Sequence, residues 1–159
     1  MYSIGENVVY PMYGAGTIEK IEEKEILGEM QKYYVLKLPY EDLKVMVPIG
    51  NVENTGLRNI ISKAEMDEVI GMLGMKSTQM PSNWNHRHRM NMDKLKSGDV
   101  HQVAEVVRNL SRVEKEKKLS TGEKKILNNA RKILISEMVL VKNISIEDAE
   151  KLIEDEINQ

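Results

Sequence analysis

Residues 81–90, PSNWNHRHRM, bring together side chains that could bind a polyanion. Trp84 is the only tryptophan of the chain. Three basic side chains follow it within five residues, namely His86, Arg87 and Arg89. A large apolar ring flanked by cations suits a distorted minor groove, because the cations hold phosphates while the ring enters an unstacked base step. We therefore predict that these four side chains contact DNA.

Further lysines extend this cationic surface. Lys94 lies on the same predicted helix as Trp84, and Lys124 and Lys125 lie in the first turn of the next-to-last predicted helix. We predict phosphate contacts for these three lysines. Because unstacking a base step costs a few kcal/mol, binding would favour DNA that is already distorted or opening. Other interpretations stay open: Trp84 packs at the start of its helix and covers the helical core, and the lysines are only solvated.

No catalytic constellation stands out elsewhere in the sequence. The chain has no cysteine, which excludes disulfides, thiolate metal sites and cysteine nucleophiles. A phosphate-binding loop and a serine-hydrolase elbow are both missing, and YGAG at residues 13–16 lacks the strand–helix context of a nucleotide site. His86 and His88 lie about 200° apart around a helix, so they cannot share a metal ion. We expect no enzymatic activity, no cofactor and no metal.

Charge is strongly segregated along the 159 residues, although the net charge is only −2. Residues 1–70 contain 7 Lys/Arg and 12 Asp/Glu, residues 86–132 contain 13 and 6, and residues 133–159 contain 2 and 7. A basic block between two acidic ones predicts a polyanionic partner for the middle of the chain, unless it is an ordinary solvated helical surface. No apolar run approaches the roughly 18 residues of a membrane span, so we expect no membrane partner. The absence of cysteine suits a reducing compartment, so we expect a cytoplasmic location.

The first 58 residues are predicted to form a small β-barrel or curled sheet. Short segments rich in β-branched residues and tyrosine alternate with turns that contain glycine, proline or aspartate. Alternation in the last segment predicts Leu43, Val45 and Val47 on one face, with Lys44 and Met46 on the other. Strands are expected over residues 6–10, 17–26, 32–38 and 43–48, with turns at 11–16, 28 and 39–42.

From residue 59 onward the periodicity is helical, so we predict a bundle of about five helices over residues 59–159 and an α+β chain. Capping patterns that mark helix starts are Ser62–Glu65, Asp99, Ser120–Glu123 and Ser145–Asp148. A further helix should begin near Ser82 and stop before Gly98. Apolar residues at helical spacing predict the core: Val100, Val103, Val107, Leu110, Ile126, Leu127, Ala130, Ile133, Leu134, Met138, Ala149, Leu152, Ile153 and Ile157.

Three stretches resemble the CarD/CdnL family of bacterial transcription regulators. GENVVYPMYGAGTIEKIE at residues 5–22 is similar to the start of the family's polymerase-interacting domain, which is a Tudor-like, SH3-like β-barrel. PSNWNHRHRMNMDKLKSGDVHQVAEVVRNL at 81–110 and LSTGEKKILNNARKILISEM at 119–138 resemble its helical DNA-binding domain. The resemblance covers almost the whole chain, and it implies a polymerase-interacting domain over 1–58 and a DNA-binding domain over 59–159.

The resemblance implies that an edge strand binds the β subunit of bacterial RNA polymerase. An unpaired edge offers backbone donors and acceptors to a partner strand, although the strand could instead complete its own barrel. Two basic family positions assist this contact, and they match Lys24 and Met46. Met46 departs from the family, because an uncharged thioether cannot form an ion pair. The matching strand consists of Leu43, Lys44, Val45, Met46 and Val47.

The resemblance also implies that Trp84 matches a family tryptophan that wedges into the minor groove at the upstream edge of the melted promoter. Nearby basic family positions match His86, Arg87 and Arg89, and His86 replaces what is often arginine, so its charge would depend on pH. The implied activity is non-enzymatic: the protein would stabilise the open promoter complex with little sequence preference. We expect a monomer that binds RNA polymerase one to one. Through the polymerase it would associate with the nucleoid.

Two other functions stay open. A polymerase adaptor that acts through protein contacts alone would use Trp84 as a core residue. A free-standing architectural DNA binder would bind DNA without polymerase. About five phosphate contacts would give a slope near −4 to −5 when the logarithm of the binding constant is plotted against the logarithm of the salt concentration. So few contacts predict weak binding by the isolated protein. Only the wedge function predicts that Trp84→Ala keeps polymerase binding and loses the effect on promoter opening.

Overall fold

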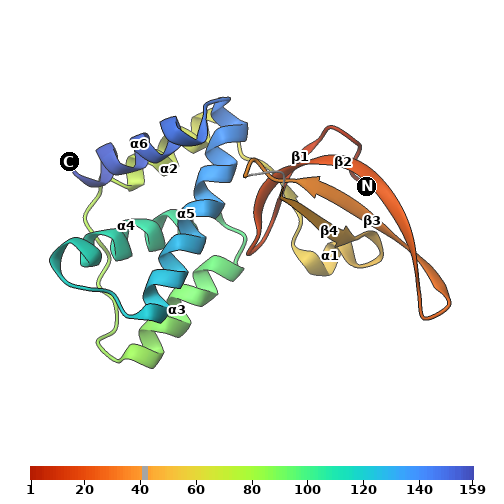
Figure 1. The fold of residues 1–159 in the computed structure, drawn as a ribbon. Coiled ribbons are helices and arrows are strands. Elements are labelled where there is room, and N and C mark those ends of the chain that lie inside the picture. The colour runs from red at the N-terminus through yellow and green to blue at the C-terminus, as the bar shows by residue number, and fades with distance from the viewer. Residues whose placement is uncertain (41–42) are drawn as a thin grey trace.

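The computed structural model describes residues 1–40 and 43–159, with the side chains of residues 51–53 left aside. A twisted antiparallel sheet forms the N-terminal part, and a bundle of helices follows it (Figure 1). The α+β fold class is therefore confirmed. The turn expected over residues 39–42 includes Glu41 and Asp42, which lie outside the described residues.

The sheet has five strands in the order β4-β3-β2-β1-β5, and each pair of neighbours is antiparallel. β4 therefore lies at one edge and β5 at the other. Short loops and hairpins connect β1 to β4 in chain order, whereas β5 returns to the far side of β1 after a 3₁₀ turn and a short helix. The bounds are β1 Asn7–Tyr10, β2 Gly14–Ile26, β3 Glu29–Lys37, β4 Lys44–Pro48 and β5 Arg58–Asn59.

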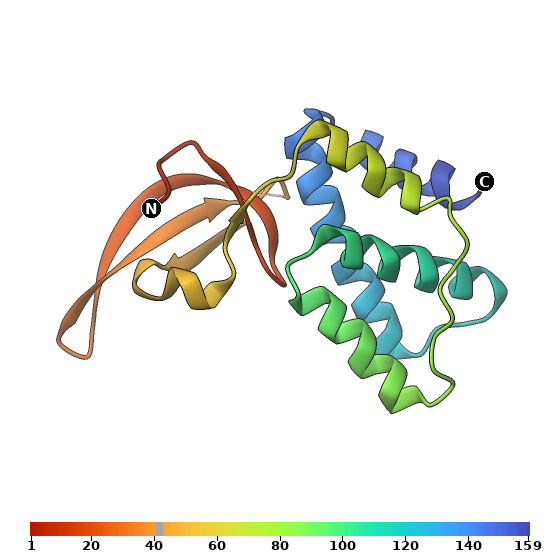
Figure 2. The ribbon, with the colours of Figure 1, turned by 180° about the vertical axis from the view of Figure 1, so that it is seen from behind.

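The β2–β3 hairpin is the longest part of the sheet, and it projects away from the helices (Figures 1 and 2). Its tip turns through Leu27 and Gly28, both with positive φ (52° and 81°). Glycine adopts this backbone readily, whereas leucine rarely does. The Leu27 side chain is 99 % exposed. The predicted turn at Gly28 is thus confirmed, and the residue before it is both strained and solvated.

Two predictions in the sheet are wrong. The turn expected over residues 11–16 ends sooner, because residues 14–16 pair with β1 and begin β2, and Leu43 does not continue the alternation of β4. Val47 is buried and Val45 packs against the sheet core, as the alternation predicts. Leu43 is 53 % exposed and precedes β4. Its N–H donates to the Tyr40 carbonyl and its carbonyl accepts from the Leu38 N–H, at 2.8 and 2.9 Å, so Leu43 closes the turn before the strand. The buried core of the sheet consists of Val8, Ile18, Tyr34, Leu36, Val47 and Leu57.

The helices begin where the capping patterns predict. Ser62, Asp99, Ser120 and Ser145 are N-caps, and each side chain accepts a hydrogen bond from a backbone N–H two or three residues later. These bonds satisfy donors that the first turn of a helix leaves unpaired. The helical elements are η1 Ile49–Asn51, α1 Val52–Thr55, α2 Lys63–Met72, α3 Trp84–Lys96, α4 Val100–Glu116, α5 Thr121–Lys142 and α6 Ile146–Ile157.

A second apolar core lies inside the helical bundle, and α4 and α5 run through its centre. The apolar stripes predicted for α4, α5 and α6 are buried there, with Leu152 only partly buried. Two separate cores are consistent with two modules, and the boundary between residues 58 and 59 stays a prediction. None of the helices within the described residues is long and apolar enough to cross a membrane.

The sheet and the bundle are joined by polar contacts on α5. The Arg58 guanidinium, on β5, donates to both carboxylate oxygens of Glu137 at 2.9 Å, and its Nε donates to the Gly98 carbonyl at 2.7 Å. Ala15, on β2, donates its N–H to Ser136 Oγ at 2.8 Å. A side chain at Gly14 would collide with that oxygen, 2.7 Å from an added Cβ, so glycine allows this close approach.

Candidate nucleic-acid interface and sheet edge

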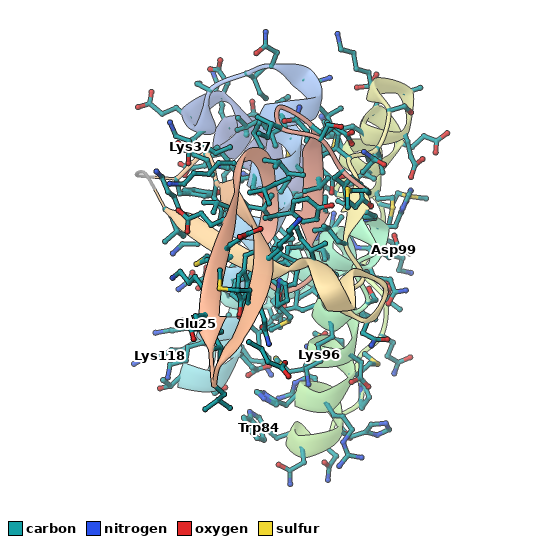
Figure 3. The ribbon with its side chains drawn as sticks, turned by 90° about the vertical axis from the view of Figure 1, so that its right-hand side faces the viewer. Glu25, Lys37, Trp84, Lys96, Asp99 and Lys118 are labelled. Atoms are coloured by element: carbon teal, nitrogen blue, oxygen red, sulfur yellow. The ribbon has the colours of Figure 1, made fainter. Side chains whose placement is uncertain are left out.

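Trp84 is the first residue of α3 and stands at one end of the bundle (Figure 3). Asn83 precedes it as the N-cap, and its Oδ1 accepts from the His86 N–H at 3.0 Å. The Trp84 side chain is 43 % exposed and is absent from the buried helical core. A large apolar ring left half in solvent is available to a partner.

The basic residues of α3 fall into two groups. His86 and Arg89 are exposed, and no ion pair within the described residues involves them. Arg87 is only 19 % exposed: its Nε donates to Glu123 Oε2 at 3.0 Å, and its Nη1 donates to the carbonyls of Pro81 and Ser82.

Lys94 belongs with Arg87. Its Nζ lies 2.9 Å from Glu105 Oε1, and its side chain is 16 % exposed. A phosphate would therefore have to compete with a carboxylate for Arg87 and for Lys94, whereas His86 and Arg89 are open to one. Sequence reasoning did not predict these pairings, because Arg87 and Lys94 meet their partners on α5 and α4 only through the fold.

The carboxyl group of Glu123 responds to this arrangement. Burial raises its pKa, but hydrogen bonds from Arg87 and Ser120 and the charge of Arg87 outweigh burial, so the pKa of Glu123 lies below its ordinary value of 4.5. Glu123 is thus ionised at neutral pH and neutralises part of the cationic surface. The site that Arg87 occupies is accordingly less positive than the sequence indicates.

The start of α5 adjoins Trp84. The indole Nε1–H donates to the Oγ of Ser120, the N-cap of α5, at 3.3 Å. Lys124 and Lys125 follow in the first turn of α5 and are exposed. The structure thus brings the N-terminal ends of α3 and α5 together, with Trp84 between them. Backbone N–H groups at helix starts and exposed lysines nearby can both bind phosphate.

His88 is a member of this cluster that sequence reasoning missed. Its ring stacks on Trp84, with 4.9 Å between ring centroids and 19° between ring planes. The signal that could have found it is the four-residue spacing from Trp84, which places the two side chains on the same face of a helix.

The second candidate surface is the edge of the sheet at β4. No described strand pairs with the outer side of β4, so its backbone groups there are open to another strand. Met46 pairs with Val35 of β3, and Lys44 forms a 3.1 Å ion pair with Glu19. Among the predicted residues, Val47 is buried, and it can offer only its backbone to a partner.

Lys24 lies apart from this edge. It is exposed near the tip of the β2–β3 hairpin and pairs with Gln31, so β3 separates it from β4. A hollow of about 500 Å³ lies between the end of β4 and the hairpin. Its lining consists of Met30, Gln31, Lys32, Pro48, Ile49 and Gly50. The structure therefore presents Lys24 and β4 on one module without direct contact.

Comparisons with known proteins match both parts of the chain to domains of CarD-like proteins. Residues 2–61 match the family described as the CarD-like/TRCF RID domain, and residues 68–154 match the CarD C-terminal domain. The chain is also 40 % identical over 145 residues to the "Putative transcription factor YdeB" of Bacillus subtilis (strain 168). That similarity covers 91 % of this chain and 95 % of the Bacillus protein.

Proposed function

The chain belongs to the CarD-like family of transcription factors, and from that premise we propose that it links RNA polymerase to promoter DNA. Its N-terminal sheet is a Tudor-like RID domain and its helical part is a CarD C-terminal domain. In the proposal, β4 binds the polymerase β subunit, and the adjoining starts of α3 and α5 bind the minor groove at the upstream edge of the bubble. The protein acts as a cytoplasmic monomer, with residues 1–58 and 59–159 as its two functional domains.

The observation that carries the DNA part is the setting of Trp84. This side chain is 43 % exposed between two helix starts, so a large part of its apolar ring is open to a partner. His86, Arg89, Lys124 and Lys125 are exposed side chains on α3 and α5, the two helices whose starts flank Trp84. Such a surface supports a wedge that inserts where bases are already unstacked.

The polymerase part is supported by the edge position of β4. A partner strand could add to its open side through backbone hydrogen bonds, which tolerate side-chain changes. Met46 replaces a basic family residue at this strand, so we propose that the contact relies on the backbone and on Lys24 more than on an ion pair at position 46. Lys44 is already paired with Glu19 and adds little positive charge.

One observation favours a second candidate, a polymerase adaptor that acts through protein contacts alone. Arg87 and Lys94 are paired with carboxylates inside the chain, which removes two of the predicted phosphate contacts. If those pairs persist on the promoter, fewer cations remain to hold DNA around Trp84. The adaptor function would then depend on β4 and would not need an exposed indole.

The test is the lifetime of competitor-challenged open complexes, formed by the cognate polymerase on a promoter with an unstable bubble. We expect the wild-type protein to lengthen the lifetime about five-fold, which corresponds to about 1 kcal/mol. Trp84→Ala should bind polymerase as the wild type does but should not lengthen the lifetime. Equal lengthening by both proteins would favour the adaptor.

A binding experiment without polymerase distinguishes the proposed function from that of a free-standing architectural DNA binder. If the protein alone binds the same promoter fragment about as tightly as the polymerase complex does, recruitment through β4 is unnecessary. We expect weak isolated binding, because few phosphate contacts are available.

A further inference from the structure

Trp84 is held by neighbours on more than one side. One face of the indole stacks on His88, and its Nε1–H donates to Ser120 Oγ at 3.3 Å. Ser120 Oγ in turn donates to Glu123 Oε1 at 3.1 Å. The capping group of α5 is thus also the anchor of the indole edge. The surface that remains exposed is what these neighbours leave uncovered.

Gly122 allows the two rings to sit against α5. A Cβ added at Gly122 would lie 3.3 Å from Trp84 Cζ2 and 3.7 Å from His88 Cε1. The first distance is tighter than ordinary van der Waals contact, so even alanine would press on the indole. The glycine therefore leaves room for the stacked pair beside the first turn of α5.

The His88 ring makes its main contact through stacking. Its Nδ1 is buried and has no hydrogen-bond partner among the described residues. An unpaired buried nitrogen is unfavourable, so hydrogen bonding at that atom does not explain the position of the ring. The stack on Trp84 explains the position of the ring. Trp84 and His88 lie four residues apart on one face of α3, and aromatic rings at this separation attract one another.

We propose that His88 is a positioning residue: its stack, together with Ser120 and Gly122, fixes the orientation in which Trp84 meets DNA. This inference rests on the proposed function, in which Trp84 is the wedge. A side chain that is immobilised only on binding loses rotamer freedom at that moment, and a preoriented side chain has already lost it. Removing the stack should therefore weaken the wedge without removing the indole.

The free protein gives a direct readout, because Trp84 is the only tryptophan and dominates the emission of the chain excited at long wavelength. We would compare wild type, His88→Ala and His88→Phe by steady-state anisotropy and acrylamide quenching. His88→Ala should lower the anisotropy and increase quenching, because the indole gains motion and exposure. His88→Phe should keep wild-type values, since phenylalanine can stack in the same place. His86→Ala is the matched control, an exposed histidine on the same helix.

The promoter assay then links orientation to function. The open-complex lifetime with His88→Ala should be about two- to five-fold shorter than with wild type: two-fold corresponds to a weak aromatic contact, and five-fold is complete loss of the lengthening. His88→Phe should restore the wild-type lifetime. If His88 acted through a hydrogen bond or through its charge, phenylalanine could not restore it. Circular dichroism and urea unfolding would establish that both variants fold as the wild type does.

The outcomes separate the two proposals. If Trp84→Ala shortens the lifetime and His88→Ala does not, the positioning role is overturned and the wedge stands. If His88→Ala leaves anisotropy and quenching unchanged, the positioning role is overturned in the free protein already. Equal lifetimes for wild type and Trp84→Ala would overturn the wedge, and the positioning role with it.

Discussion

Two Arg–Glu pairs with buried carboxylates lie in different parts of the chain, one between the sheet and the bundle and the other within the bundle. Arg58 binds Glu137 through two parallel hydrogen bonds of 2.9 Å, and Glu137 is 1 % exposed. Arg87 meets Glu123 through one bond of 3.0 Å from its Nε, and its Nη1 donates to the carbonyls of Pro81 and Ser82.

The difference lies in how completely each carboxylate is surrounded. Glu137 accepts three hydrogen bonds, two from Arg58 and one from the Ile61 N–H at 3.0 Å, whereas Glu123 accepts two from side chains, one from Arg87 and one from Ser120 Oγ. A buried, fully bonded carboxylate fixes the elements around it, and losing a partner leaves an uncompensated charge. The Glu123 side chain is 9 % exposed against 1 % for Glu137, and Arg87 lies on the same helix as Trp84, so we expect a phosphate to displace Glu123 more readily than Glu137.

The largest effect expected from breaking either pair is at Arg58. Arg58→Ala should lower the free energy of unfolding by about 3 kcal/mol, because Glu137 would stay buried without its counter-charge. Urea unfolding monitored by circular dichroism measures this. Arg131→Ala is the matched control, since Arg131 makes one 2.9 Å bond to the half-exposed Glu154. A loss at Arg58 no greater than at Arg131 would contradict the distinction between the two regions.

A smaller and pH-dependent effect is expected at the second pair. The pKa of Glu123 in the folded protein lies below 4.5, so its stabilising contribution is present above pH 4.5 and is lost as the pH falls through the folded value. Glu123→Gln should therefore reduce stability at pH 7 by about 1 kcal/mol, and the difference from wild type should shrink in acid.

Urea unfolding of wild type and Glu123→Gln between pH 7 and pH 3 checks this. Glu116→Gln, at the exposed end of α4, serves as the control and should show no such trend. A difference between Glu123→Gln and wild type that stays constant across this range would mean that packing, and not charge, makes the contribution.

The smallest effect is expected at Lys44 on the sheet edge. Lys44 is attracted to Glu19 at 3.1 Å but lies directly opposite Lys37 across the ladder, and both interactions are solvated. Lys44→Ala should change the unfolding free energy by less than about 0.5 kcal/mol. The same variant tests the proposed backbone contact, since strand addition should tolerate it in a polymerase-binding assay. A marked loss of polymerase binding would show that the Lys44 side chain contributes after all.

Local features of the fold were predictable and distant ones were not. Each capping pattern, such as Ser120–Glu123, needs only neighbouring residues, and each begins a helix. Leu43 was misplaced because the alternation of apolar residues extends back to position 43, whereas its backbone hydrogen bonds close a turn there and β4 begins one residue later. Arg58 and Glu137 are 79 positions apart, and Arg87 and Glu123 are 36 apart, so neither pairing has a local signal. The role of Trp84 as a DNA wedge stays a prediction.

The strand order has a mechanical consequence. Arg58 lies on β5, at the edge of the sheet opposite β4. A strand that added to β4 would therefore lie at the opposite edge from the Arg58–Glu137 pair, with β3, β2 and β1 between them. In that arrangement, the width of the sheet and the angle at which it meets α5 near Glu137 would determine where Trp84 lies relative to a partner bound at β4.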